Sequence, residues 1–254
     1  LASLQLFQSF KLLLNLFISC KEMKKLVVLT GAGMSAESGI KTFRDSGGLW
    51  EEYEVSKVAT PEGWHKDPEL VLRFYNERRQ QLARSQPNAG HTGLAELEKY
   101  FDVRIITQNI DNLHERGGSS SVLHLHGELT KARSTYDDSL IYDIGYGEIN
   151  PGDKCSLGSQ LRPHIVWFGE AVPMLEEAIN LTMKADIFVV IGSSLNVYPA
   201  AGLVSYAPQK ASLWLIDPKE VHIASGRKIE VIREGASKGV VILTERLLKK
   251  YYGK

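Results

Sequence analysis

The chain has 254 residues, the size of one large domain that can bury its own core without disulfides or a metal. Its 30 basic and 30 acidic residues balance, which argues against nucleic-acid binding, because broad phosphate contact needs a basic excess. The two cysteines, Cys20 and Cys155, lie far apart and favour a reducing, cytoplasmic compartment without a disulfide framework.

Residues 1–22 are rich in Leu and Phe, but Lys11 and Asn15 interrupt their apolar runs. These runs are shorter than the ~20 residues that span a membrane, and no signal or transit peptide pattern is present. We interpret them as an N-terminal extension without a catalytic part and expect no membrane partner. An amphipathic helix that contacts a membrane or a partner is the alternative.

A glycine-rich turn follows the first predicted strand. The apolar residues 26–29 indicate a strand buried on both faces, and a G-x-G-x-x-A turn with Gly31 and Gly33 comes directly after it. The glycines allow a tight turn and a close ligand, and the N–H groups of a following short helix can bind a pyrophosphate. Ser35 could cap that helix or donate to phosphate. The turn predicts dinucleotide binding, with a turn that binds nothing as the alternative.

Residues 53–84 are predicted to be mainly helical. Thr60 and Asp67 each precede a proline, which is the pattern of an N-cap followed by proline at the first helical position. The second helix places Tyr75 and Arg78 three residues apart on one face. From this spacing alone, a solvated basic face beside one core aromatic residue is the preferred interpretation.

A polar cluster follows the next predicted strand. A helix over residues 92–99 leads to a strand over residues 103–107, after which Gln108, Asn109 and Asp111 follow. Because open α/β sheets bind ligands outside the carboxyl ends of parallel strands, these side chains are candidate ligand contacts.

Two alternating histidines lie in residues 122–128, which the sequence predicts to be a single strand. His124 and His126 would then share one face. No third ligand recurs at a suitable spacing for a metal. One of the two is a plausible general base, because the pKa of histidine lies near neutrality, and a structural histidine is equally plausible.

The remaining elements return to the strand–helix alternation after an insert over residues 129–163. In chain order, we expect residues 165–170 to resume the sheet or its edge, a helix over 174–183, a strand over 186–191 ending at Gly192-Ser193-Ser194, a strand over 212–217 ending at Asp217, and a helix over 240–250. An acid at a strand end is the residue type that binds ribose hydroxyls.

This alternation predicts an α/β fold with a doubly wound, parallel, Rossmann-like sheet. Its core would comprise residues 23–52, 86–128 and 165–254 of a catalytic domain that spans 23–254. A helical module (53–85) and a small lobe (129–164) would be inserted in it.

Five stretches together resemble the sirtuin family of NAD-dependent protein deacylases, and they occur in the family's order: GAGMSAESGIKTFR, TQNIDNLHERGG, HLHGEL, RPHIVWFGE and IGSSLNVYPAAG. The resemblance covers nearly all of residues 23–250. It implies NAD as the cofactor and acylated-lysine proteins as partners. It also implies an enzyme that transfers the acyl group from lysine to ADP-ribose and releases nicotinamide.

The resemblance also implies site residues. For the cofactor these are Gly31, Ala32, Gly33, Ser35, Phe43, Arg44, Gln108, Asn109, Ile110, Asp111, Gly192, Ser193, Ser194, Asn196, Asp217 and Ala236. The catalytic residues would be Gln108, Asn109 and His126, with His126 as the base that deprotonates the ribose. The substrate residues would be Ala59, Tyr75, Arg78, Val166, Trp167, Phe168, Gly169 and Glu170, with 166–170 pairing with the peptide by β-addition.

The region around Tyr75 and Arg78 resembles the bacterial-type class III branch, which removes succinyl and malonyl groups. In that branch a Tyr and an Arg three residues apart bind the distal carboxylate of the acyl chain. A guanidinium in a mostly apolar pocket suits such a charge-assisted contact. Removal of acetyl groups remains compatible with this site.

The chain departs from the family pattern in two places. Sirtuins usually hold a zinc ion with two Cys-x-x-Cys pairs, but only Cys155 remains here, with Gly158 at its partner's position, so no metal is expected. Asp217 stands where many members have Asn, which favours NAD over NADP. Mono-ADP-ribosyl transfer and a non-catalytic NAD- or ADP-ribose-binding module stay open as alternatives, and the sequence leaves the oligomeric state open.

Overall fold

The computed structural model describes residues 23–41, 53–221 and 226–253. Its centre is a six-stranded sheet of order β3-β2-β1-β7-β8-β9 in which every pairing is parallel. The strands are β1 (Lys25–Thr30), β2 (Asp102–Thr107), β3 (Val122–His124), β7 (Ile187–Ile191), β8 (Ser212–Ile216) and β9 (Ile229–Ile232). The strand order reverses at β1, so the predicted doubly wound α/β sheet is confirmed, and the sequence missed β9.

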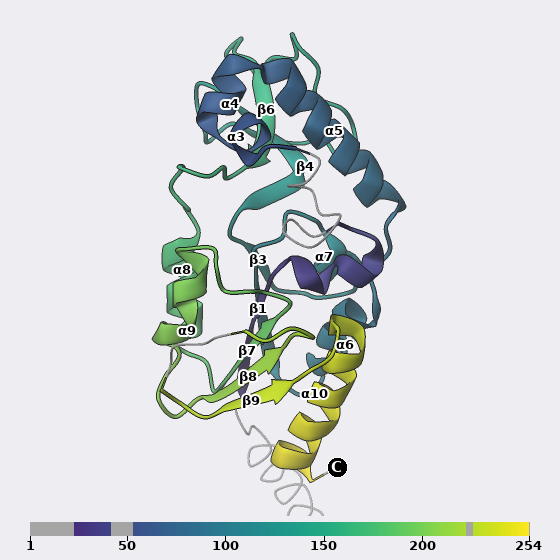
Figure 1. Cartoon of the computed structure of the whole chain (residues 1–254), viewed down its shortest axis with the longest axis vertical. Helices are drawn as coiled ribbons and strands as arrows, with labels where there is room; N and C mark the ends of the chain where they lie inside the picture. Colours follow the sequence, from purple (N-terminus) through teal and green to yellow (C-terminus); the bar gives the residue numbers. More distant parts are fainter. Residues whose placement is uncertain (1–22, 42–52, 222–225, 254) are drawn as a thin grey trace, which may run out of the picture.

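Helices cover both faces of this sheet (Figure 1). One face packs on α6 (Ala89–Leu97) and α10 (Ala236–Tyr252), and the other on α8 (Leu175–Thr182) and α9 (Leu203–Tyr206). Alternate residues of β1 enter the two cores: Leu26 and Val28 the first, Val27 and Leu29 the second. Each such side chain contributes ~1.5–3 kcal/mol through burial, which is why this short apolar run becomes the central strand.

A second lobe stands at the other end of the molecule (Figure 1). It contains an antiparallel sheet of order β5-β4-β6, made of β4 (Gly127–Ser134), β5 (Ile141–Asp143) and β6 (Leu161–Ile165). The helices α3 (Val55–Val58), α4 (Pro61–Lys66) and α5 (Pro68–Arg84) belong to the same lobe. Thr60 and Asp67 accept hydrogen bonds from Gly63 N and Leu70 N, which confirms both predicted N-caps.

The run over residues 122–128 is not one strand, and that prediction was wrong. β3 ends at His124, and the chain turns into β4 at Gly127, whose φ is +81°. A Cβ at Gly127 would lie 2.0 Å from the carbonyl oxygen of His164 in β6. The chain therefore needs glycine at the point where it passes from the six-stranded sheet into the second lobe, and the site lies beside this point.

Three other predictions about elements were wrong in part. The glycine turn leads into two 3₁₀ turns, η1 (Ala32–Met34) and η2 (Ala36–Ser38), rather than into one short helix. The α6 helix begins at Ala89, since Asn88 caps it with its side chain. Residues 166–170 join neither sheet. The sequence also missed α7 (Leu113–Arg116), η3 (Ala200–Gly202) and α9 (Leu203–Tyr206).

The predicted division into an extension and a catalytic domain stays a prediction, because residues 1–22 lie outside the described residues. Within the described ranges, no helix is long and apolar enough to cross a membrane.

Candidate active site

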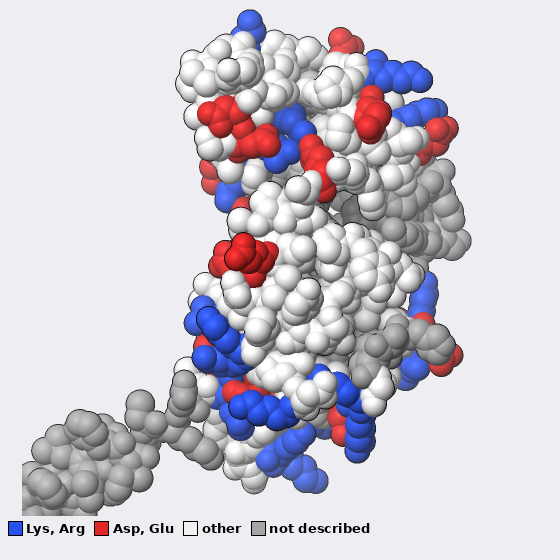
Figure 2. Space-filling view, turned by 90° about the vertical axis from the view of Figure 1, so that its left-hand side faces the viewer, with Lys and Arg blue, Asp and Glu red and all other residues white. Residues whose placement is uncertain are grey.

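The carboxyl ends of β1, β2, β7 and β8 open into a pocket of about 510 Å³. Residues from the second lobe form its other wall. Figure 2 shows that the surface narrows to a waist between the two lobes, with acidic side chains on either side of it. The predicted site residues that line the pocket are Gly31, Ala32, Gly33, Ala59, Tyr75, Gln108, Asn109, Ile110, His126, Val166, Trp167, Phe168, Gly169, Glu170, Gly192, Ser193, Ser194 and Asp217. The fold thus brings together residues that are 186 positions apart, from Gly31 to Asp217.

The glycines of the first turn allow two loops to pack on each other. Gly31 N donates to Ile191 O at 3.0 Å and Gly33 N to Gly192 O at 2.9 Å. A Cβ on Gly31 would lie 2.7 Å from the Gly192 oxygen, and a Cβ on Gly33 would lie 2.7 Å from its Cα. The two glycine loops therefore form one floor for the pocket, and side chains on either glycine would separate them.

The loop after β2 is fixed by buried hydrogen bonds. Asn109 donates from Nδ2 to Gly31 O at 3.0 Å and to Ser35 Oγ at 3.1 Å. Ser35 Oγ donates to Asp111 Oδ2 at 2.8 Å, and Asp111 Oδ1 accepts from Leu113 N. Ser35 and Asp111 are buried behind the pocket wall, and burial raises the pKa of Asp111. Both residues hold Asn109 in place rather than line the pocket.

The ring of His126 is oriented by the same loop. Its Nδ1 lies 3.0 Å from the carbonyl oxygen of Gln108, which can only accept, so Nδ1 carries the hydrogen and Nε2 keeps its lone pair. Burial lowers the pKa of His126, and the imidazole is neutral at neutral pH. Gln108 also donates to Ser193 Oγ at 2.9 Å. His126 is thus set up to accept a proton in the pocket.

Tyr75 and Arg78 of α5 are both shielded from solvent. Tyr75 Oη accepts from Trp167 Nε1 at 3.0 Å, so its own hydrogen is left for donation, and burial raises the pKa of its phenol. The Arg78 side chain is 17% exposed, and its buried Nε and Nη1 have no hydrogen-bond partner within the described ranges. Tyr75 lines the pocket and Arg78 does not.

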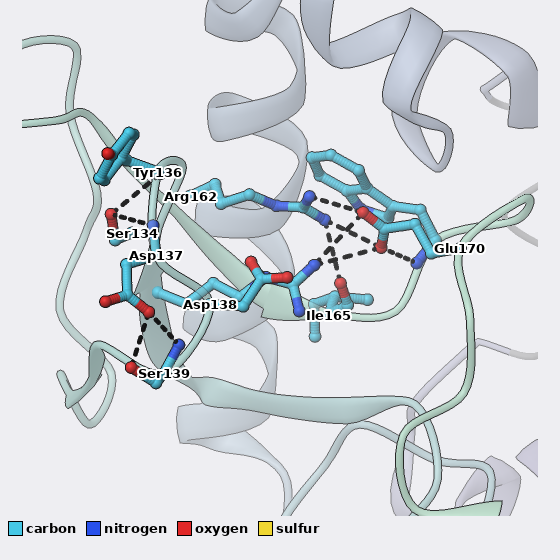
Figure 3. A network of polar contacts seen from close by, with 10 residues as sticks. Ser134, Tyr136, Asp137, Asp138, Ser139, Arg162, Ile165 and Glu170 are labelled. Carbon is cyan, nitrogen blue, oxygen red and sulfur yellow. Dashed lines mark hydrogen bonds and ion pairs between the residues drawn. The ribbon is translucent and has the colours of Figure 1, made fainter.

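Two arginines of the second lobe hold segment 166–170, the predicted substrate segment. Glu170 accepts from Arg162 Nη1 at 2.7 Å and from Arg133 Nη2 at 3.3 Å, and its Oε2 also accepts from Trp167 N at 2.8 Å. The Arg162 guanidinium stacks on the Trp167 ring, 3.2 Å from its centroid. Figure 3 shows Arg162 and Glu170 pointing toward each other beside Ile165. The side chain of Glu170 therefore shapes the segment through its contacts with the protein.

The comparisons with known proteins agree with this geometry. The model of the Sir2 family matches residues 31–199, which is more than half of the chain. The chain belongs to the Sir2 family. A protein of Bacteroides thetaiotaomicron named NAD-dependent protein deacylase is 60% identical over 231 residues, covering 89% of this chain and 99% of that protein. A Helicobacter pylori protein of the same name is 52% identical over 227 residues, covering 89% and 99%.

Solved Sir2 structures share the fold. A Sir2 homologue mutant in complex with ADP-ribose has a TM-score of 0.83 at 38% identity and covers 92% of this chain and 95% of its own. A Sir2 homologue in complex with NAD has a TM-score of 0.81 at 39% identity, with coverage of 90% and 91%. The sirtuin resemblance is thereby confirmed, and this Sir2 chain is an enzyme of the NAD-dependent protein deacylase class.

Some predicted residues of this Sir2 chain lie elsewhere. Asn196 and Ala236 do not line the pocket, and Phe43 and Arg44 lie outside the described residues. The pocket also contains residues that the sequence did not identify: Ala36, Glu37, Ile165, Val172, Val197, Tyr198, Pro199, Pro218, Lys219, Glu220, Val221 and Gly235. All of them lie within four positions of a predicted site residue, so extending each predicted segment by that much would have found them.

No three His, Cys, Asp or Glu side chains gather into a possible metal site in the described part of the Sir2 chain. Cys155 is buried and free. The second lobe has other ties to α5: Asn76 exchanges hydrogen bonds with Ile149, and the buried Arg79 donates to Gly147 O at 2.8 Å. Hydrogen bonds to arginine thus support a loop of this lobe.

Proposed function

We propose that this pocket removes acyl groups from lysine side chains of proteins at the expense of NAD, with His126 as the base. The observation that carries the proposal is the fixed tautomer of His126, whose Nδ1 donates to Gln108 O while its ring lines the pocket. NAD, when bound, supplies the ribose that receives the acyl group and nicotinamide as the leaving group.

The residues of the pocket fit NAD. The interlocked loops of Gly33 and Gly192 present backbone without side chains, which suits a pyrophosphate. Asp217 follows β8, where an acid suits ribose hydroxyls and its charge opposes a 2′-phosphate. Asn109 is held by Gly31 O and Ser35, so its position in the wall is set before a ligand enters. His126 would accept a ribose proton at Nε2.

The proposal extends to acyl choice, with Tyr75 and Arg78 binding a distal carboxylate. Tyr75 has a hydrogen to donate, because its oxygen already accepts from Trp167. Arg78 has two buried N–H groups without a partner in the described part of the chain, an arrangement that costs free energy unless an anion is bound. Succinyl and malonyl groups carry such a carboxylate, and acetyl groups do not.

Protein substrates and a cytoplasmic location complete the proposal. A Sir2 structure with a deacetylated p53 peptide and 3′-O-acetyl ADP-ribose has a TM-score of 0.75 at 30% identity, covering 91% of this chain. It supports a peptide as the substrate. The two distant cysteines favour a reducing compartment.

One experiment tests both parts of the proposal. It measures kcat/KM with NAD on one peptide whose lysine bears acetyl or succinyl. His126→Ala should abolish turnover of both while NAD still binds; undiminished turnover contradicts the role of His126. Arg78→Met should lower kcat/KM for succinyl about 10- to 100-fold, because a hydrogen bond to a charged group is worth ~1.5–3 kcal/mol, and should spare acetyl.

A matched control is Arg73→Met, which removes an exposed arginine from the same helix and should change neither rate. Equal losses on both peptides in Arg78→Met would show that Arg78 supports the fold and does not select the acyl group.

A further inference from the structure

His124 lies two residues before His126, at the end of β3, and the proposed function gives it no role. Its side chain is 8% exposed, and it does not line the pocket. Its hydrogen bonds in the structure are with the protein.

Both ring nitrogens of His124 face acceptors. Nδ1 lies 3.1 Å from the carbonyl oxygen of Asn109, and Nε2 lies 2.8 Å from Glu115 Oε1. A carbonyl oxygen and an ionised carboxylate can only accept hydrogen bonds, so both nitrogens must carry hydrogen and the ring is an imidazolium. His126 meets only one acceptor, the Gln108 carbonyl, and is neutral.

The surroundings of His124 support its positive charge. The charged or titratable groups around His124 and its partner Glu115 come from three elements: His114 and Glu115 itself from α7, Asp111 from the loop after β2, and Glu128 and Lys131 from β4. Three of them are acids. Lys131 is paired with Glu128 at 2.6 Å, and burial keeps the pKa of His114 well below its ordinary value, so His114 adds no charge.

Burial alone would lower the pKa of His124, but the hydrogen bond and the charge of Glu115 outweigh it and the pKa is raised. For Glu115, burial works in the other direction, and the contact with His124 keeps its pKa below the ordinary value. Both shifts favour the ionised pair, as the hydrogen-bond geometry of the ring also does.

We propose that His124 is a positioning residue that holds the Asn109 carbonyl as an imidazolium, in the same enzyme form in which His126 is the neutral base. Two histidines of one short segment thus bind the consecutive carbonyls of Gln108 and Asn109, in opposite protonation states. When His124 loses its proton, one nitrogen turns a lone pair toward an acceptor, and its hold on Asn109 or Glu115 is lost. The kinetic part of this inference rests on the proposed function.

The consequence is a bell-shaped dependence of kcat/KM on pH. Its rising limb belongs to deprotonation of His126 and its falling limb to deprotonation of His124. A residue that only supports the fold would not place a limb in the pH profile of an enzyme that stays folded.

The test combines NMR with kinetics on the whole chain. Imidazole ¹⁵N signals of the wild type are followed from about pH 5 to about pH 10, a range that brackets histidine titration, and a His124→Asn spectrum assigns His124. kcat/KM is measured over the same range for the wild type and Glu115→Gln, with folding checked by circular dichroism. Removing the charge of Glu115 should move the falling limb down by about one pH unit or more and leave the rising limb in place.

Glu96→Gln is the matched control, because Glu96 is an acid of α6 whose side chain is 72% exposed and pairs with Lys99. This variant should leave both limbs of the pH profile unchanged. His124 titrating below pH 6.5, the ordinary histidine value, or an unmoved falling limb in Glu115→Gln, overturns the inference. If the wild type turns over neither acylated peptide, the proposed function fails, while the NMR titration still decides the charge of His124. If Glu115→Gln does not fold, the NMR titration of the wild type still decides the charge of His124.

Discussion

Within the described part of the chain, Glu170 is the one acid that contacts both Arg162 and Arg133. Arg133 also lies 3.5 Å from the exposed Asp138. The two arginine side chains are 8–9% exposed, and Glu170 is 19% exposed. Glu170→Gln would leave two nearly buried guanidinium groups facing each other without a full counter-charge. Arg162→Met would leave the Arg133–Glu170 contact and the Trp167 N hydrogen bond in place.

We therefore predict that Glu170→Gln destabilises the protein more than Arg162→Met. Breaking a buried pair from one side costs ~3–5 kcal/mol, and the partial exposure of Glu170 favours the lower end. At ~2–4 °C per kcal/mol for a chain of this size, Glu170→Gln should lower the Tm by about 6–12 °C. The smaller loss for Arg162→Met follows because one arginine still pairs with Glu170.

Thermal unfolding of both variants, and of the double variant, checks this ranking. In the Arg162→Met background, Glu170→Gln should cost less than in the wild type, because neighbouring sites couple by ~0.5–3 kcal/mol. Glu54→Gln is the control, since its pair with Lys57 is exposed on both sides. The reasoning is refuted if Glu170→Gln lowers the Tm no more than Arg162→Met or Glu54→Gln.

The same pair gives a dependence on pH. The contacts with Arg162 and Trp167 N outweigh burial and lower the pKa of Glu170 below its ordinary value of 4.5. A carboxylate with a lowered folded-state pKa contributes stability above that ordinary value and loses it as pH falls through the lowered one. The Tm difference between wild type and Glu170→Gln should therefore shrink below pH 4.5.

Two further predictions concern the lobe that contains the six-stranded sheet. Gly33→Ala should weaken NAD binding and lower the Tm, because its Cβ would lie 2.7 Å from Gly192 Cα. The control is Gly202→Ala, whose Cβ meets nothing within 4 Å and which should change neither NAD binding nor the Tm. An NAD titration and thermal unfolding of both variants check this. Burial lowers the pKa of His91 to about 4, so the unfolded chain binds more protons below pH 6.5 and the Tm should fall between pH 6.5 and 4. His91→Asn should flatten that fall, and an unchanged slope would show that His91 does not titrate with unfolding.

Local patterns were enough for much of the fold. The apolar run 26–29 predicted the central strand, because a strand buried on both faces has no polar position. Thr60 and Asp67 predicted two helix starts through contacts within three residues. By contrast, β9 reads Ile-Glu-Val-Ile at the edge of the sheet, partly exposed, and only pairing with β8 makes it a strand.

The candidate site was predicted by residue type more accurately than by role. Ser35 was expected to cap a helix or bind phosphate, yet its hydroxyl is buried between Asn109 and Asp111. Glu170 was expected in the segment that pairs with the peptide; it lines the pocket, and the structure adds that its carboxylate contacts two arginines. The partners of Ser35 lie 74 and 76 positions away in the chain, which spacing within a motif cannot reveal. Arg162, by contrast, lies in the same stretch as Glu170, RPHIVWFGE, and only the fold shows that the two side chains meet.

The glycine turn shows why residue type and role can separate. The sequence interprets Gly31 and Gly33 as room for a ligand, and the structure shows that the backbone of Gly192 occupies the space where their side chains would lie. The two interpretations require the same residue for different reasons. Because the loops after β1 and β7 bond to each other through these glycines, a ligand that contacts one loop also depends on the other. A substitution at Gly33 would therefore act on both loops at once.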